Sequence, residues 1–245
     1  MKNRLIVTEN VTRLTVAFEG LCLRDPGVTG MGLIYGFTGS GKTTSLTMLK
    51  NRYNACYVRA QSVWTPAAMT RAICRELGLL PQQGAAKNVE VICEFLKQTG
   101  RALLIDEADY LLKDLRMVEL TRDLHDETTV PVLLVGMSGH DDMGIERQIR
   151  SRPKFKQLAR RMREWVEFAP INFADAQLFA ATNCEVVVED DLIAEALHQC
   201  HGSIGLLTVA LSRIEAAAKA MGLTRIGLEA WGDRALHLGV HGGVV

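Results

Sequence analysis

Eight residues near the start of the chain have the composition of a phosphate-binding loop. Residues 36–43, GFTGSGKT, fit the pattern G-x-x-x-x-G-K-[ST]. Glycines let the backbone turn so that successive N–H groups point at phosphate oxygens, and the following helix adds positive potential from its amino end. Lys42 would reach the outer phosphates, and the Thr43 hydroxyl would bind Mg²⁺. The residues expected to contact the nucleotide here are Gly36, Thr38, Gly39, Ser40, Gly41, Lys42, Thr43 and Thr44.

A second acidic motif follows an apolar run further along the chain. Residues 103–109 are LLIDEAD, the pattern of a buried strand that ends in carboxylates. Asp106 would hold Mg²⁺, through water, and would complete the nucleotide site. Glu107 would orient and polarise an attacking water, which favours hydrolysis over transfer of the phosphoryl group to a substrate. Asp109 fits the cap of the next helix. The alternative for the acidic pair is a solvated turn.

Short apolar runs alternate with segments of helical period, as in a parallel sheet covered by helices. Strands are expected at residues 31–35, 55–60, 102–105, 131–135 and 165–168, and helices at 41–51, 66–77, 87–98 and 111–126. After Pro170 the pattern becomes helical, at residues 173–182, 191–200, 204–221 and 228–236. The sequence therefore predicts an α/β core followed by a small helical domain. The expected boundaries are 1–29 for a lead-in segment, 30–170 for the core, 171–238 for the helical domain and 239–245 for a flexible tail.

Composition excludes several classes of protein. There is no run of about 18 apolar residues, so no membrane span is expected, and the first residues lack the apolar stretch of a signal peptide. The six cysteines are scattered and fit free thiols better than a disulfide framework. His198, Cys200 and His201 resemble metal ligands, but no second ligand cluster accompanies them, which favours an ordinary helix end. The formal net charge is zero, yet residues 147–163 hold eight basic residues and no acidic one.

The order of these motifs resembles that of the AAA+ ATPases, and within them the transposition regulators, the group of the phage Mu B protein, TnsC and TniB. The residues that carry the resemblance are 36–44, 65–78 (TPAAMTRAICRELG), 103–109, 130–136 and 201–220 (HGSIGLLTVALSRIEAAAKA). The resemblance implies a three-layer P-loop core with a helical lid. It also implies ATP and Mg²⁺ as cofactors, ATP bound between subunits, and assembly on duplex DNA as rings or helical filaments, with largely sequence-nonspecific contacts. The implied partner is a transposase, and the implied location is the cytoplasm of a bacterial cell or a phage-infected host.

In such assemblies an arginine of the neighbouring subunit completes the catalytic site. Arg160 and Arg161 match the position of this arginine, with Arg147, Arg150 and Arg152 as substitutes. The basic stretch could instead contact DNA phosphates or form a solvated face.

Two departures from the family pattern concern nucleotide sensing. Ser138 is only a weak candidate for the polar residue after the fourth strand, and residues 203–206 (SIGL) replace the usual lid arginine.

The resemblance also places DNA against the loops that precede the acidic strand. Here these loops supply Arg59, Gln61, Thr65, Lys87 and Asn88, whose backbone contacts would carry little sequence information. The favoured hypothesis is an ATP-dependent DNA-binding ATPase that delivers target DNA to a transposase. One alternative is a helicase loader or initiator of the IstB/DnaC type. Another is a nucleotide-gated scaffold that does not bind DNA.

Overall fold

The structure is a computed structural model that describes residues 1–2, 4–139 and 144–236. The chain divides into two compact units. The larger one comprises Arg13–Phe37 and Lys42–Phe168, and the smaller one comprises Met1–Thr12, Thr38–Gly41 and the chain from Ala169 on. Each unit has a hydrophobic cluster of its own.

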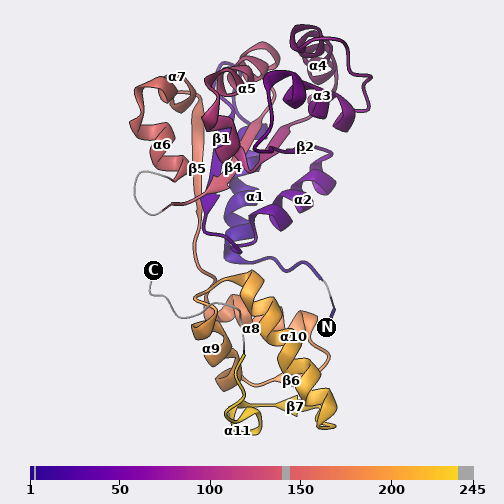
Figure 1. The fold of residues 1–245 in the computed structure, drawn as a ribbon, viewed down its shortest axis with the longest axis vertical. Helices are drawn as coiled ribbons and strands as arrows, with labels where there is room; N and C mark the ends of the chain where they lie inside the picture. Colours follow the sequence, from indigo (N-terminus) through magenta and orange to yellow (C-terminus); the bar gives the residue numbers. More distant parts are fainter. Residues whose placement is uncertain (3, 140–143, 237–245) are drawn as a thin grey trace. The chain divides into compact units, whose positions relative to one another are not determined.

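A five-stranded parallel sheet forms the centre of the larger unit, with strand order β2-β3-β4-β1-β5 (Figure 1). Because the strands are parallel, their carboxyl ends lie along one edge. This sheet confirms the predicted α/β class. The strands are β1 (Met31–Gly36), β2 (Cys56–Arg59), β3 (Leu103–Asp106), β4 (Val132–Met137) and β5 (Met162–Phe168).

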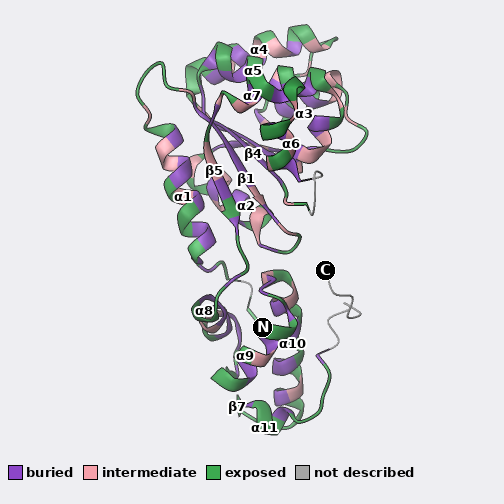
Figure 2. Cartoon of the chain, turned by 90° about the vertical axis from the view of Figure 1, so that its left-hand side faces the viewer, coloured by how far each residue is buried: buried purple, intermediate pink, exposed green. Residues whose placement is uncertain are grey.

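Helices cover both faces of this sheet, which gives the predicted three layers. Alternate residues of each central strand point to opposite faces, so that Leu103 and Ile105 of β3 join one cluster while Leu104 joins the other. Figure 2 shows the strands largely buried, whereas the helices carry exposed residues on their outer sides. One face packs against α1 (Glu9–Cys22) and α2 (Lys42–Tyr53), and the other against α3 (Pro66–Glu76), α4 (Ala85–Thr99), α5 (Leu115–Thr128) and α6 (Ile145–Ser151).

Helix α1 lies where the sequence predicted only a lead-in segment. Its apolar residues Leu14, Phe18 and Leu21 are spaced for one helical face, and all three are fully buried. A second difference concerns the helix expected at residues 111–126. The chain instead forms a 3₁₀ turn, η1 (Ala108–Lys113), and α5 then begins after Asp114, whose carboxylate accepts a hydrogen bond from Arg116 N at 3.0 Å.

The connection from α6 to β5 is made of short elements that carry the basic stretch. These are a 3₁₀ turn, η3 (Pro153–Phe155), and the single helical turn α7 (Lys156–Ala159). Phe155 and Leu158 anchor the connection in the core, which leaves most of its basic side chains exposed.

The smaller unit is mainly helical, as the sequence predicted. It also has a two-stranded parallel ribbon, which is too short to be recognised from alternation, and its last helix ends early because Gly232 takes a left-handed φ of 63°. Its elements are α8 (Phe173–Asn183), β6 (Val187–Val188), α9 (Asp190–Gln199), α10 (Ile204–Ala220), β7 (Arg225–Ile226) and α11 (Leu228–Trp231).

One buried histidine ties three parts of the larger unit together. His125 of α5 is 5% exposed; its Nε2 accepts from Gly30 N at 3.1 Å, and its Nδ1 lies 2.8 Å from Val130 O. Since Gly30 N can only donate, Nδ1 carries the ring proton and donates to Val130 O. Burial lowers the pKa of His125, because the charged ring would lose its hydration.

This geometry makes the stability of the larger unit depend on pH. A depressed pKa means that the unfolded chain takes up the proton first, so the free energy of unfolding should fall as the pH drops below about 6.5. We expect His125→Gln to be less stable at neutral pH by about 1–3 kcal/mol and to lose less further stability on acidification. Urea unfolding at about pH 7.5 and pH 5.5 measures both effects. The exposed His198→Gln is the matched control, and equal pH dependence in wild type and His125→Gln would contradict the assignment.

Candidate nucleotide site

The loop at the end of β1 has the backbone conformation that its glycines predict. Gly39 and Gly41 take φ values of 84° and 91°, which disfavour residues with a Cβ. Gly36, the last residue of β1, lies so close to β5 that an added Cβ would meet Phe168 O at 2.8 Å. The loop leads directly into α2, which begins at Lys42. The fold therefore places the amino end of a helix after a glycine-rich turn, the arrangement that binds phosphate.

Lys42 lies folded against this loop. Its Nζ donates to the carbonyl oxygens of Gly36 at 2.7 Å and of Phe37 at 2.8 Å. Burial lowers the pKa of Lys42, and the negative charges of Asp106, Asp109 and Glu107 partly offset this effect. The ammonium group is thus held at the mouth of the first strand, in a position to exchange carbonyl oxygens for phosphate oxygens.

A side-chain hydrogen bond joins the phosphate-binding loop to the acidic motif. Thr43 Oγ1 donates to Asp106 Oδ2 at 2.9 Å, which joins the start of α2 to the end of β3. A hydroxyl and a carboxylate are hard oxygen donors of the kind Mg²⁺ prefers, and Mg²⁺ usually takes one or two such protein ligands together with substrate phosphates. Within the described residues no cluster of three metal-binding side chains exists. The donor set therefore fits a nucleotide-bound Mg²⁺ better than a metal held by protein alone.

Asp106 is buried and held by further donors. Its Oδ1 accepts from Glu107 N at 2.9 Å, and its Oδ2 accepts from the Tyr57 hydroxyl at 3.1 Å. Burial and the nearby charge of Asp106 raise the pKa of Tyr57 to about 12, so this hydroxyl stays a donor at neutral pH. Tyr57 lies in β2 and was not among the residues expected at the site.

Glu107 has a different environment. Its backbone has a φ of 54°, an unusual value for a residue other than glycine, asparagine or aspartate. Its Oε1 accepts from Arg59 Nη2 at 3.0 Å, and the Arg59 side chain is 61% exposed. Arg59 was expected to contact DNA, and the structure pairs it with Glu107. The register of β2 against β3, with Arg59 opposite Asp106, explains this pairing.

The end of β4 is connected to the acidic motif by Asp109. Its Oδ2 accepts from Met137 N at 2.9 Å, and burial raises the pKa of this carboxyl. A Cβ at Gly136 would lie 2.5 Å from Asp109 Oδ2, so glycine is needed there. Asp109 thus joins β4 to the site, a role beyond the expected helix cap.

Ser138, expected to contact the nucleotide, lies beside the start of the loop. Its backbone N donates to Gly36 O at 3.0 Å. Ser138 also lines a cavity of about 390 Å³, and none of the cavity's lining residues belongs to the phosphate-binding loop. The polar lining residues include Tyr35, Glu146 and Glu167. Its role as a nucleotide sensor stays a prediction.

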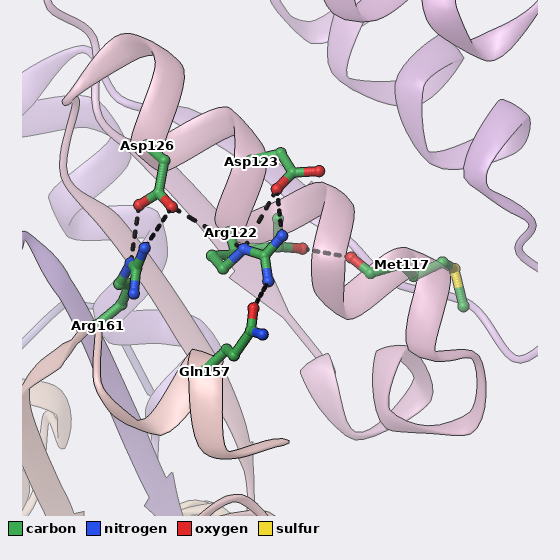
Figure 3. A network of polar contacts seen from close by, with 7 residues as sticks. Met117, Arg122, Asp123, Asp126, Gln157 and Arg161 are labelled. Atoms are coloured by element: carbon green, nitrogen blue, oxygen red, sulfur yellow. Dashed lines mark hydrogen bonds and ion pairs between the residues drawn. The ribbon is translucent and has the colours of Figure 1, made fainter. Parts of the chain in front are cut away.

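The two arginines expected to act between subunits differ in their surroundings. Arg161 makes a two-pronged contact with Asp126 of α5, with Nε–Oδ1 and Nη2–Oδ2 distances of 3.0 and 2.8 Å. Figure 3 shows this pair beside Arg122, which contacts Asp123 and Gln157. Arg160 is exposed, and the described part of the chain offers its side chain no partner. Arg161 thus connects the start of β5 to α5, whereas the exposed Arg160 could contact a neighbouring subunit.

The other basic residues of this stretch are partly engaged as well. Arg150 stacks on Trp165, with its guanidinium carbon 4.0 Å from the ring centroid, and it also pairs with Glu146. Lys154 lies over the ring of Phe155.

The residues expected to contact DNA do not share one environment. Arg59, Gln61, Thr65 and Lys87 are exposed. Asn88 requires a correction, because its side chain is 1% exposed. Its Oδ1 accepts from Gln82 N at 2.6 Å, and its Nδ2 donates to Gln82 O and Thr70 Oγ1. Asn88 therefore fixes the loop before α4 onto α3 and cannot reach DNA in this conformation.

The larger unit contains the residues that match a known protein family. Residues 27–143 match the model of the AAA domain family. These residues include the loop, β3 with Asp106 at its end, Glu107 directly after it, and β4. Residues 27–143 therefore belong to the AAA domain family, the family of the AAA+ ATPases. No curated protein matches its sequence. None of its described helices is both long and apolar enough to cross a membrane.

Solved structures similar to this chain share its fold at low sequence identity. Orc1 of Aeropyrum pernix, solved in complex with DNA, is 18% identical with a TM-score of 0.60, and the match covers 92% of this chain and 64% of Orc1. Cdc6p of Pyrobaculum aerophilum is 18% identical with a TM-score of 0.61, covering 89% and 63%. RuvB of Thermotoga maritima, a Holliday junction branch migration motor, is 18% identical with a TM-score of 0.60, covering 91% and 66%. This chain thus spans less than two thirds of each of these proteins.

The position of Lys42 makes a direct prediction for nucleotide binding. Lys42→Ala should abolish measurable ATP binding, a loss of at least about 100-fold, because a charge-assisted contact to the phosphates disappears. Titration calorimetry with Mg²⁺ present measures the loss. Lys97→Ala is the matched control, since Lys97 pairs with Glu127 on the surface of α4 and α5. Wild-type affinity in Lys42→Ala would contradict the assignment.

Proposed function

We propose that this ATPase binds ATP with Mg²⁺, assembles on duplex DNA as a homo-oligomer and directs target DNA to a transposase. The observation that carries the nucleotide part is the Thr43–Asp106 hydrogen bond, which joins the phosphate loop to the acidic strand beside Lys42 and Glu107. The transposase part rests on the resemblance of residues 65–78 and 201–220 to the transposition regulators. DNA as a partner gains support from the similar fold of Orc1 in complex with DNA and of the RuvB branch migration motor.

The residues of the site divide the work of hydrolysis. Lys42 and the loop N–H groups would hold the phosphates, and Thr43 and Asp106 would hold Mg²⁺, which supplies charge neutralisation when bound. Glu107 would orient a water molecule toward the terminal phosphate and accept its proton. In the structure Glu107 Oε1 is paired with Arg59, and this contact restrains the carboxylate.

This pairing suggests how DNA would control hydrolysis. Arg59 is exposed at the end of β2, beside the loop expected to meet DNA. A DNA phosphate that attracted its guanidinium would weaken the Arg59–Glu107 contact and release the carboxylate. The same side chain thus provides both the expected DNA contact and the restraint on Glu107.

The electron microscope offers the most direct test of this function. Glu107→Gln should bind ATP normally but hydrolyse it at least about 100-fold more slowly, because the general base is lost. Negative-stain images should then show stable rings or filaments when both ATP and duplex DNA are present, and none with either one alone. Hydrolysis at the wild-type rate would contradict the role of Glu107. Assembly without bound DNA would favour the scaffold alternative, and DNA binding without rings or filaments would favour a helicase loader.

Arg160, which is exposed and has no partner among the described residues, is the better of the two candidates for an arginine shared between subunits. Arg160→Ala should slow hydrolysis by about 10³-fold with little change in ATP affinity, since a trans arginine acts on the transition state. Arg161→Ala should instead lower stability, because Asp126 loses its two hydrogen bonds to Arg161 and keeps the longer ion pair of 3.9 Å with Arg122.

Mixing inactive variants distinguishes action in trans from action within one subunit. In a mixture of Arg160→Ala and Glu107→Gln, some sites combine an intact Glu107 with an intact neighbouring Arg160, so activity should partly return. A mixture that stays as inactive as its components would exclude Arg160 as the shared arginine.

A further inference from the structure

Two alternate residues of β2 contact the two carboxylates of the acidic motif. Tyr57 and Arg59 point to the same side of the strand, because their positions differ by two. The Tyr57 hydroxyl lies 3.1 Å from Asp106 Oδ2, and Arg59 Nη2 lies 3.0 Å from Glu107 Oε1. In the parallel register Tyr57 lies opposite Leu104 and Arg59 opposite Asp106, so each side chain reaches a carboxylate one or two residues beyond its opposite residue. Strand β2 therefore holds each carboxylate with a separate side chain.

The three hydrogen-bond donors to Asp106 come from different parts of the chain. Thr43 of α2 belongs to the phosphate loop, and its hydroxyl oxygen is itself expected to bind the metal. The backbone N of Glu107 belongs to the acidic motif itself. Of these three donors, Tyr57 alone belongs neither to the phosphate loop nor to the acidic motif. Its hydroxyl can keep its contact with Asp106 when the nucleotide and metal arrive.

The Tyr57 ring is fixed independently of the hydroxyl. It packs against the hydrophobic cluster under α1 and α2. Lys50 lies 5.7 Å from the ring centroid, and an ion pair of 2.7 Å with Glu76 holds this lysine in turn. Removing only the oxygen atom should therefore leave the ring and the strand in place.

We propose that Tyr57 is a positioning residue that fixes the Asp106 carboxylate for Mg²⁺. This inference rests on the proposed ATP·Mg²⁺ site. Without the phenol donor, Thr43 is the one donor left to Asp106 Oδ2 among the described residues, and the carboxylate can rotate away from the orientation that the metal needs. The cost falls on metal binding, whereas nucleotide contacts that do not involve the metal stay unchanged.

The test is the Mg²⁺ dependence of ATP binding by Tyr57→Phe, measured in the Glu107→Gln background so that hydrolysis does not interfere. Fluorescent ATP is titrated at fixed concentration with increasing Mg²⁺, and separately without Mg²⁺ in the presence of a chelator. The loss of one hydrogen bond to a carboxylate should raise the half-saturating Mg²⁺ concentration about threefold to tenfold. Affinity without Mg²⁺ should equal that of the parent protein.

Tyr53→Phe is the matched control. Tyr53 ends α2, and its hydroxyl also donates to a carboxylate, that of Glu19, outside the site. The same atom is removed, so its Mg²⁺ dependence should stay at the parent value.

The possible outcomes separate the inference from the function beneath it. A parent protein whose ATP binding ignores Mg²⁺ would overturn the proposed function and this inference with it. A parent that responds to Mg²⁺ together with an identical response in Tyr57→Phe would overturn the inference alone. An equal loss of affinity with and without Mg²⁺ would also overturn it, since Tyr57 would then support the fold rather than the metal ligand.

Discussion

The parallel pairing of β3, β4 and β1 is the constraint on which the nucleotide site depends. Parallel strands that share a sheet end at the same edge, so backbone pairing alone places the carboxyl ends of β3, β4 and β1 side by side. Two side-chain contacts then connect these ends. Thr43, at the start of α2 after β1, donates to Asp106 at the end of β3, and Asp109 accepts from Met137 N at the end of β4. Buried alternate residues on both faces keep the strands in register.

Neighbouring carboxylates in this arrangement are held with very different firmness. Asp106 is buried and accepts three hydrogen bonds, two from side chains and one from backbone. Glu107 has one ion pair to an arginine that is largely exposed, and water and salt weaken such a contact. Its left-handed backbone is also a conformation that costs free energy in a residue with a side chain. Under the proposed function, the rigid position suits Asp106 as a metal ligand, and the weak restraint suits Glu107 as a general base.

The sequence predicted those parts of the fold that are set by local pattern. The phosphate loop and the strand before Asp106 follow from glycine spacing and an apolar run, and both are present. Helix α1 could have been found from the spacing of Leu14, Phe18 and Leu21, whereas β6 and β7 are two residues long and give no periodic signal. The burial of Asn88 and the pairing of Arg161 with Asp126 depend on residues far away in the chain, so composition alone could not reveal them.

The same limitation explains why the basic stretch was hard to assign from sequence. Eight positive charges with no acidic residue among them suggest a partner outside the chain, yet several of these charges find partners within it. Asp126 of α5 binds Arg161, and Trp165 of β5 lies against Arg150. The ion pair with Asp126 offsets the charge of Arg161 in the surface field that would attract DNA, whereas the contact with the neutral Trp165 ring orients Arg150 without cancelling its charge. Six of the eight basic residues stay exposed, although Arg150 and Arg163 among them also have acidic partners, Glu146 and Glu164. Arg160 is exposed without a partner among the described residues. One such cation suits recognition of a single anionic group, whereas tracking along a DNA backbone requires many contacts in series.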